Sequence, residues 1–240
     1  MKFVYNATST SYLIPHTSYL SFMEQNPLYP IFLKLHTLNM LIVGAGQVGY
    51  EKMFFILKSS PEANITVVAP WVSPEIEELL AKGNYKVRII KKEFEASDLD
   101  GMDLAVAATD IKELNQEVQR EAKARKVLVN IADTPDLCDF YLGSIVTRGN
   151  LKVAISSNGK SPTFTKRFRQ VLEEVLPVDA GEVLENLKVI RDRLKGDFEY
   201  KVKKLNVITA NMVEQGGVKC ADCPDCPDCP DYATCNKAGL

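Results

Sequence analysis

The sequence has little of several features that would assign it to a specialised class. Its 240 residues contain one tryptophan and two histidines, and 29 basic side chains nearly balance 31 acidic ones. Because nucleic-acid-binding proteins normally carry a basic excess, the charge argues against a nucleic-acid partner. No apolar run approaches the roughly 18 residues of a membrane-spanning helix, so we expect no membrane partner either.

Cysteine is also scarce outside one short stretch. Five of the six cysteines fall within residues 220–240, a distribution unlike a disulfide framework spread through a fold. Residues 1–26 lack the continuous apolar core of a signal peptide, and we expect them to be a loosely ordered extension. The protein is therefore predicted to be cytoplasmic.

A glycine-rich motif organises the chain. The apolar run Met40–Val43 leads into Gly44-x-Gly46-x-x-Gly49, and an amphipathic stretch follows. In such a motif the first glycine permits a tight turn, the second lets the backbone approach a pyrophosphate, and the third lets the helix pack on the strand. The alternative is a tight turn without a ligand. We predict a dinucleotide site that contains Gly44, Gly46, Gln47, Val48 and Gly49.

Strand and helix patterns alternate from Tyr29 to about Asp133, as an α/β fold with a parallel sheet requires, so residues 27–140 are predicted to be the NAD-binding domain. Helical patterns lie between the runs that are typical of strands, and two of these helices start near Ser73-Pro74 and Ile111. The expected strands cover residues 40–43, 64–69, 86–90, 103–108 and 126–131. In a doubly wound sheet of this kind ligands bind at the carboxyl ends of the strands, here near Gly44, Pro70, Thr109 and Asp133.

One expected residue is missing from the second strand. An acidic side chain about 20 residues past the glycines usually holds the ribose of NAD, but here the strand ends in Pro70 and Trp71. No arginine replaces it to hold the extra phosphate of NADP. The motif therefore leaves NAD and NADP open, and Trp71 either flanks the adenine or covers the sheet.

The pattern changes after Asp133. Residues 144–156 read as a β-hairpin around Gly149-Asn150, and Ser161-Pro162 starts a helix with an apolar stripe that lasts until Pro177. Because a hairpin and one helix cannot form a core alone, we predict that residues 141–177 are a dimerisation domain and the protein a homodimer. Residues 178–217 are expected to be a small helical domain, and residues 218–240 a cysteine-rich tail.

Several dispersed motifs together resemble one family. They are, in order, Tyr29–Leu33, the glycine motif, Val67–Pro70, Ala107–Asp110, Asn130–Asp133 and Ser156–Pro162. In this order and spacing they resemble the precorrin-2 dehydrogenase family, which includes the N-terminal part of siroheme synthases. The resemblance implies a Rossmann domain, a dimerisation domain, a helical domain, and NAD-dependent oxidation of precorrin-2 to sirohydrochlorin. In some members ferrous iron (Fe2+) insertion follows and gives siroheme.

The expected chemistry needs a base near the nicotinamide, because oxidation removes a hydride and a proton. Asp133 ends the fifth strand and is the best-placed candidate, although Asp-Thr-Pro is also an ordinary turn signal. The family's catalytic aspartate falls on this position. Asn130 orients a ligand or bonds to the backbone, and Thr109 contacts the nicotinamide or is structural.

A tetrapyrrole substrate carries many carboxylates, so its pocket should present cations. The candidates lie in the hairpin and the following helix, where the alternative is a solvated helix face. They are Arg148, Lys160, Lys166, Arg167 and Arg169.

The metal-binding side chains are few. His16 and His36 are expected to be structural or exposed rather than ligands. The tail places soft ligands close together, but it lacks the gap between pairs of a zinc site and matches a cluster-binding run only in part. The tail either binds a metal, such as iron or nickel, or is an oxidisable tail without one. Its candidate ligands are Cys220, Cys223, Cys226, Cys229 and Cys235.

A function of another class stays open. A Rossmann domain with a small dimerising domain also suits a redox-sensing regulator that binds NAD or NADH without catalysis. Asp133 and the basic helix discriminate the two, because a sensor needs neither.

Overall fold

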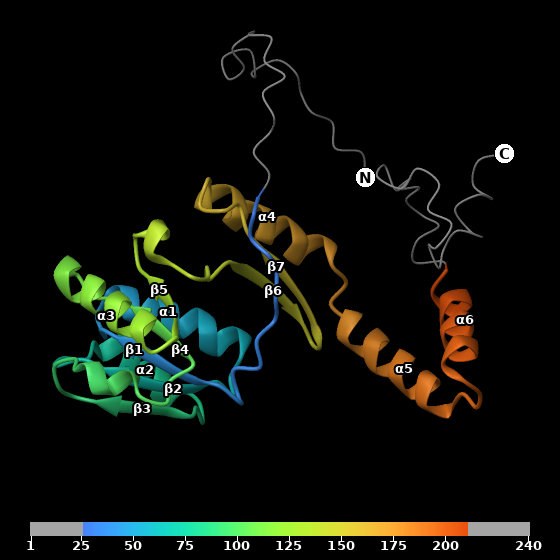
Figure 1. Ribbon diagram of the computed structural model, residues 1–240. Helices are drawn as coiled ribbons and strands as arrows, with labels where there is room; N and C mark the ends of the chain where they lie inside the picture. The colour runs from blue at the N-terminus through green and yellow to red at the C-terminus, as the bar shows by residue number, and fades with distance from the viewer. Residues whose placement is uncertain (1–25, 211–240) are drawn as a thin grey trace, which may run out of the picture. The chain divides into compact units, whose positions relative to one another are not determined.

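The computed structural model describes residues 26–210, and its largest element is a five-stranded parallel sheet (Figure 1). Its strands are β1 (Asn39–Val43), β2 (Asn64–Val68), β3 (Val87–Ile90), β4 (Leu104–Ala107) and β5 (Leu128–Ile131). Their order in the sheet is β3-β2-β1-β4-β5. This is the order of the Rossmann fold, which confirms the predicted doubly wound α/β sheet. The order reverses direction between β1 and β4, where such sheets bind their ligands.

The sheet is buried on both faces. Successive side chains of each strand point to opposite sides, so each strand contributes to two cores. Met40 and Ile42 of β1 pack in one core with α1 (Gln47–Ser59) and α2 (Pro74–Ala81). Leu41 and Val43 pack in a second core with α3 (Lys112–Ala124) and the 3-10 helix η1 (Ala96–Leu99). The continuous apolar runs of the sequence thus form a sheet covered on both sides.

The second helix begins where its sequence predicts. Ser73 is the N-cap of α2, Pro74 is its first residue, and Glu75 and Glu77 lie in the first turn. The Ser73 hydroxyl, however, makes no capping hydrogen bond to the helix. The start of α2 therefore depends on Pro74, which has the helical φ built in, and on the acidic side chains near the helix dipole.

The outer edge of β5 is covered by an irregular segment, residues 138–140, that follows the short 3-10 helix η2 (Pro135–Leu137). The Asp139 N–H donates to the Val129 carbonyl at 2.7 Å, and the Val129 N–H donates to the Asp139 carboxylate at 3.0 Å. The Ile131 N–H donates to Cys138 Sγ at 3.1 Å. The segment thus satisfies edge groups that would otherwise be open to pairing with another strand.

A two-stranded hairpin follows, β6 (Ser144–Arg148) and β7 (Leu151–Ile155), joined by Gly149-Asn150. Gly149 has a φ of +57°, and glycine at the first turn position suits a type II′ turn. The predicted helix is α4 (Pro162–Val175), where the Ser161 hydroxyl accepts from the Phe164 N–H at 3.2 Å. This bond is the expected side-chain cap.

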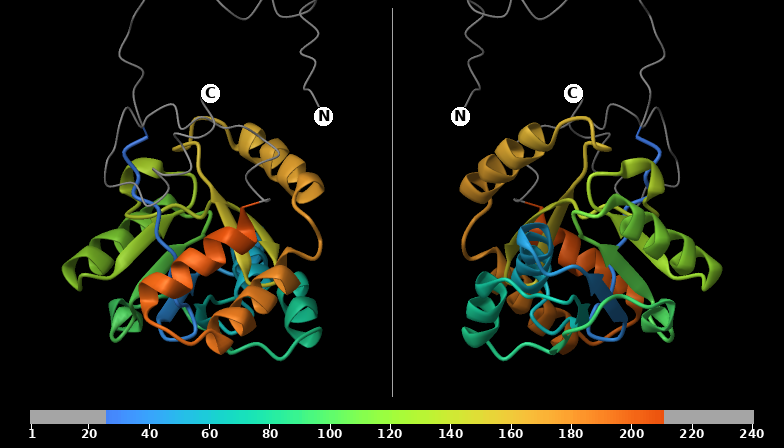
Figure 2. Two further views of the ribbon diagram at one scale, coloured as in Figure 1. Left: turned by 90° about the vertical axis from the view of Figure 1, so that its right-hand side faces the viewer. Right: turned by 90° about the vertical axis from the view of Figure 1, so that its left-hand side faces the viewer.

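The chain divides into two compact units. Among the described residues, the first combines 26–146 with 154–173, and the second combines 147–153 with 174–210. Within the second, α5 (Ala180–Arg193) and α6 (Phe198–Thr209) follow one another and are the orange helices of Figure 2. Gly196, between them, has a φ of +132°. The predicted boundaries at 141, 178 and 218 stay a prediction. None of the helices within residues 26–210 has both the length and the apolar character needed to span a bilayer.

Candidate functional site

The first glycine of the motif sits in a conformation and a space that only glycine tolerates. Gly44 has a φ of +99°, and a Cβ atom on it would lie 2.6 Å from the Ala108 carbonyl oxygen and 2.9 Å from Thr109 Cγ2. Its N–H donates to the Val68 carbonyl at 3.0 Å. The turn after β1 is therefore packed between the ends of β2 and β4.

The other two glycines have opposite surroundings. A Cβ on Gly46 would meet nothing within 4 Å, whereas one on Gly49 would lie 2.3 Å from the Gly44 carbonyl oxygen. Gly49 is thus required by the packing of α1 on the turn, as expected for the third glycine. Gly46 is not required by the protein's own packing, so the space beside it is available for a ligand.

The start of α1 suits an anion. Gly46 is the N-cap, the helix has no side-chain cap, and its first turn has no acidic residue. Gln47 is exposed and Val48 is half-buried against the core. The first N–H groups of a helix lack intrahelical partners and lie at the positive end of its dipole, so they fit the pyrophosphate of a dinucleotide.

The end of β2 lies beside this turn. The Ser73 N–H donates to the Ala45 carbonyl at 2.9 Å, which ties the segment after β2 to the glycine loop. Pro70 is exposed, and Trp71 is 61% exposed. Most of the Trp71 surface is therefore uncovered and open to a ligand, and a contact with the adenine stays a prediction.

Thr109 follows β4 and is held by a residue that the sequence analysis missed, Asn115 of α3. The Asn115 amide oxygen accepts from the Thr109 hydroxyl at 2.8 Å and from its N–H at 3.3 Å, and the amide nitrogen donates to the Thr109 carbonyl at 2.9 Å. Asn115 is only 7% exposed. The Thr109 hydroxyl is therefore engaged in the protein, and its methyl group faces the glycine turn beside the Ala108 carbonyl.

Asp133 ends β5 in a left-handed conformation, with a φ of +58°. Aspartate is among the few non-glycine residues that tolerate this conformation. The flanking backbone is fixed: the Ala132 N–H donates to the Ala107 carbonyl at 2.9 Å, and Cys138 Sγ lies 3.3 Å from the Ile131 carbonyl and 3.4 Å from the Thr134 carbonyl. The exposed Asp133 carboxylate thus stands on a well-defined turn at the carboxyl edge of the sheet.

Asn130 and Cys138 make hydrogen bonds to the backbone around that turn. The Asn130 amide donates to the Phe140 carbonyl at 2.8 Å, and Asn130 is 6% exposed. This bond accounts for the amide within the protein, and a substrate contact by Asn130 stays a prediction. Burial raises the pKa of the Cys138 thiol, whereas its hydrogen bond from the Ile131 backbone opposes the rise.

The predicted cations fall into different parts of the structure. Arg148 ends β6 in the second unit, whereas Lys160, Lys166, Arg167 and Arg169 belong to the first. Lys160, Lys166 and Arg167 are exposed, and Arg169 forms an ion pair with Glu173 one helical turn on. Their role in substrate binding stays a prediction.

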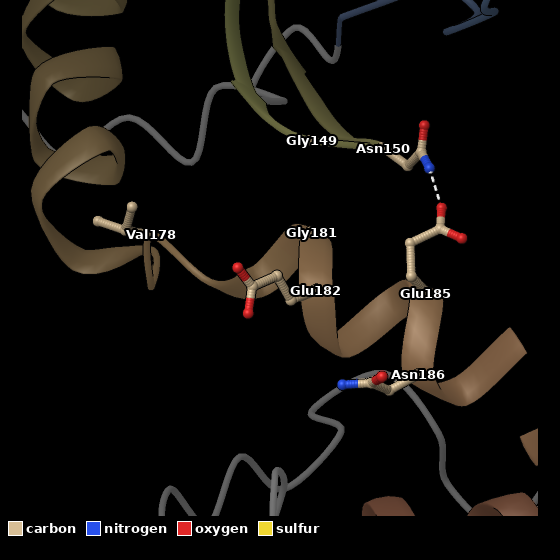
Figure 3. A pocket seen from close by; sticks show the side chains of 7 residues that line it. All are labelled: Gly149, Asn150, Val178, Gly181, Glu182, Glu185 and Asn186. Carbon is tan, nitrogen blue, oxygen red and sulfur yellow. Dashed lines mark hydrogen bonds between the residues drawn. The ribbon is translucent and has the colours of Figure 1, made fainter. Parts of the chain in front are cut away.

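One hollow of the surface contains none of the predicted site residues (Figure 3). It lies where the Gly149 turn rests on the start of α5: a Cβ on Gly149 would be 2.9 Å from the Gly181 Cα. The Asn150 amide donates to the Glu185 carboxylate across it. Its lining is Gly149, Asn150, Val178, Gly181, Glu182, Glu185 and Asn186. These contacts join the turn of the hairpin to α5. The glycine turn therefore remains the candidate functional site.

Metal ligands do not gather among residues 26–210, where no group of three or more His, Cys, Asp or Glu side chains is placed to hold an ion. His36 precedes β1 within this range. His16 and the tail ligands Cys220, Cys223, Cys226, Cys229 and Cys235 lie outside the described residues.

Comparison with known proteins first gives the class. The family model described as "Putative NAD(P)-binding" matches residues 31–144, and the one described as "Sirohaem biosynthesis protein central" matches residues 148–174. The first range contains the glycine turn and Asp133, and the second contains most of α4. The fold and the site thus define an NAD(P)-binding Rossmann protein with a sirohaem-biosynthesis central segment.

Individual relatives agree. Siroheme synthases of Methylobacillus flagellatus and Pseudoalteromonas atlantica are 38% and 37% identical over 70% and 73% of this chain. The chain spans about a third of their length, 35% and 37%. The solved structure of SirC, a precorrin-2 dehydrogenase, is 29% identical with a TM-score of 0.61, and the match covers 80% of this chain and 94% of that one. The chain belongs to the precorrin-2 dehydrogenase and siroheme synthase family.

Proposed function

We propose that the protein is an NAD-dependent dehydrogenase that oxidises precorrin-2 to sirohydrochlorin, acting as a homodimer in the cytoplasm. The observation that carries the proposal is the carboxyl edge of the sheet, where a ligand-ready glycine turn and Asp133 end strands of one parallel sheet. The likeness to SirC, a precorrin-2 dehydrogenase, over 94% of that chain supports the substrate.

The reaction removes two hydrogens from the substrate, one as a hydride and one as a proton. The hydride passes to the nicotinamide of NAD, which is the chemistry that the cofactor supplies. The residues at the start of α1 bind the pyrophosphate, and the Thr109 methyl and the Ala108 carbonyl border the turn. The Asp133 carboxylate accepts the proton from the macrocycle, as its exposed position at the sheet edge permits.

Iron insertion into the product is the finer part of the proposal. Insertion releases protons from pyrrole nitrogens, and the same Asp133 carboxylate is suited to accept them. In that case ferrous iron is a substrate, and the tail cysteines deliver it. A chain that ends at Gln215 tests the tail, because it would oxidise precorrin-2 normally but insert iron more slowly at limiting metal.

The central test is an anaerobic assay of precorrin-2 with NAD, read by NADH formation and by the sirohydrochlorin spectrum. Wild type is compared with Asp133→Asn, since asparagine also tolerates a positive φ, and with Asp136→Asn as an exposed neighbouring control. Loss of a general base should lower kcat by about 10²- to 10⁴-fold in the first variant alone. If wild type binds NAD but forms no NADH, a redox-sensing regulator replaces the enzyme.

A further inference from the structure

Asn115 lies outside the glycine motif, yet its side chain makes three hydrogen bonds to one residue at the sheet edge, Thr109. It belongs to the first turn of α3, where its own N–H donates to the Ile111 carbonyl at 3.0 Å. Its side chain turns back to the loop after β4 and pairs with both backbone groups and the hydroxyl of Thr109. A surface asparagine would gain little stability from such hydrogen bonds, because water competes for them. Asn115, however, is only 7% exposed.

Thr109 is in turn packed on the cofactor turn. A Cβ atom on Gly44 would lie 2.9 Å from Thr109 Cγ2. The N–H of the preceding residue, Ala108, donates to the Val43 carbonyl at 2.8 Å. A shift of the Thr109 loop would therefore remove one wall of the glycine turn. Three groups of Thr109 are fixed by Asn115, and the Ile111 N–H adds a bond to the Thr109 hydroxyl at 3.2 Å.

We propose that Asn115 is a positioning residue for the dinucleotide, which holds the Thr109 loop against Gly44 so that the turn after β1 has its cofactor-binding shape. The proposal rests on the proposed function, because it assumes that this turn binds NAD. Removing the amide leaves the N–H and the carbonyl of Thr109 without their side-chain partner, and such groups seek water or other partners by moving. The loop then lies farther from Gly44 and the cofactor loses a wall.

The test measures the dissociation constant of NAD by calorimetry on full-length variants. Asn115→Ala should raise it by about tenfold, and should raise the KM for NAD more than it lowers kcat. Val118→Ala is the matched control, since Val118 is fully buried on the same helix one turn on and touches the β5 side of the core. It should lower thermal stability but change the NAD dissociation constant by less than twofold.

A milder variant covers the case in which Asn115→Ala does not fold. Thr109→Val keeps the methyl group and both backbone bonds to Asn115 but loses the hydroxyl's bond to Asn115 at 2.8 Å and its bond from the Ile111 N–H at 3.2 Å. It should raise the dissociation constant about threefold. The inference is overturned if both variants bind NAD as wild type does, or if Val118→Ala loses as much affinity as they do. If wild type itself binds no NAD, the proposed function fails, and with it the premise of this inference.

Discussion

At the residue scale, the second and third glycines of the motif should fail in different ways. Gly46→Ala places a methyl group in open space, so the free energy of unfolding should change by less than about 1 kcal/mol while NAD binding is lost. Gly49→Ala places it 2.3 Å from the Gly44 carbonyl oxygen, so the protein should be destabilised by at least about 2 kcal/mol. Urea unfolding and NAD titration of both variants measure the two effects.

The contrast depends on the ligand occupying the space beside Gly46. Equal stability loss in both variants would mean that the protein itself fills that space. Unchanged NAD affinity in Gly46→Ala would mean that the pyrophosphate binds elsewhere.

Cys138 gives a prediction about alkaline pH. Burial raises the pKa of its thiol above the ordinary value of 9.0, so the folded protein holds this proton more tightly than the unfolded chain. The resulting stability is fully present below pH 9 and is lost as pH rises through the folded-state pKa. The difference in unfolding free energy between wild type and Cys138→Ala should therefore shrink above pH 9, as measured by urea unfolding at a series of pH values. A difference that stays constant up to pH 11 would contradict the raised pKa.

The sequence predicts which residues lie at the carboxyl edge of the sheet. It predicts the hydrogen bonds that those residues make less well. Gly44, Thr109 and Asp133 were placed by the rule that strands of a parallel sheet end at one edge. Asn115 was missed because its signal is weak: an asparagine in the first turn of a helix looks like an exposed polar residue until its partner Thr109 is known. The bond from Asn130 to Phe140 was likewise invisible, since the chain that carries Phe140 has no regular pattern.

At the scale of elements, we predict that the irregular segment along the edge of β5 depends on the side chain of Asp139. The Asp139 carboxylate accepts from the Val129 N–H, pairs with Lys123, and is 19% exposed. Asp139→Ala leaves the strand N–H without its acceptor, and should lower the free energy of unfolding by about 2 kcal/mol. Asp139→Asn keeps an oxygen acceptor and should lose about half as much.

Urea unfolding of these variants beside Asp136→Ala, an exposed neighbour, measures the effect. The control should change stability by less than about 0.5 kcal/mol. If Asp139→Ala were as mild as the control, the segment would not depend on its side-chain bonds to cover the edge.

The elements differ in how far the sequence predicts them. Strands β1 to β5 follow β-branched or apolar runs bounded by glycine, proline or charged residues, so their existence and order were predictable, with ends that shift by one or two residues. The sequence predicts a small helical domain over residues 178–217, and the described part of this range is two helices separated at Gly196. The cover of β5 was not predictable, because it consists of side-chain bonds rather than a repeating pattern.

At the scale of the whole molecule, the chain carries the dinucleotide fold and the central segment of its family on separate stretches. The first is complete in itself, since its sheet is covered on both faces. The central segment is different, because α4 leaves large apolar side chains uncovered. Phe164 and Phe168 are 62% and 42% exposed, and their rings stack with centroids 5.9 Å apart.

These uncovered rings lead to the prediction for the proposed homodimer. An apolar helix stripe is stable in water when a second apolar surface covers it, and a second copy of α4 supplies a matching one. Replacing both Phe164 and Phe168 by glutamate removes two aromatic contacts and adds charge, so it should weaken the dimer by about a hundredfold or more. Sedimentation at micromolar concentration should show wild type at twice the chain mass and the double variant at the chain mass of 26.7 kDa. Phe55→Glu is the matched control, since Phe55 of α1 is 51% exposed but lies outside the central segment, and it should leave the dimer intact. A wild-type protein that sediments as a monomer would remove the dimer from the proposal, and the exposed rings would then need another partner.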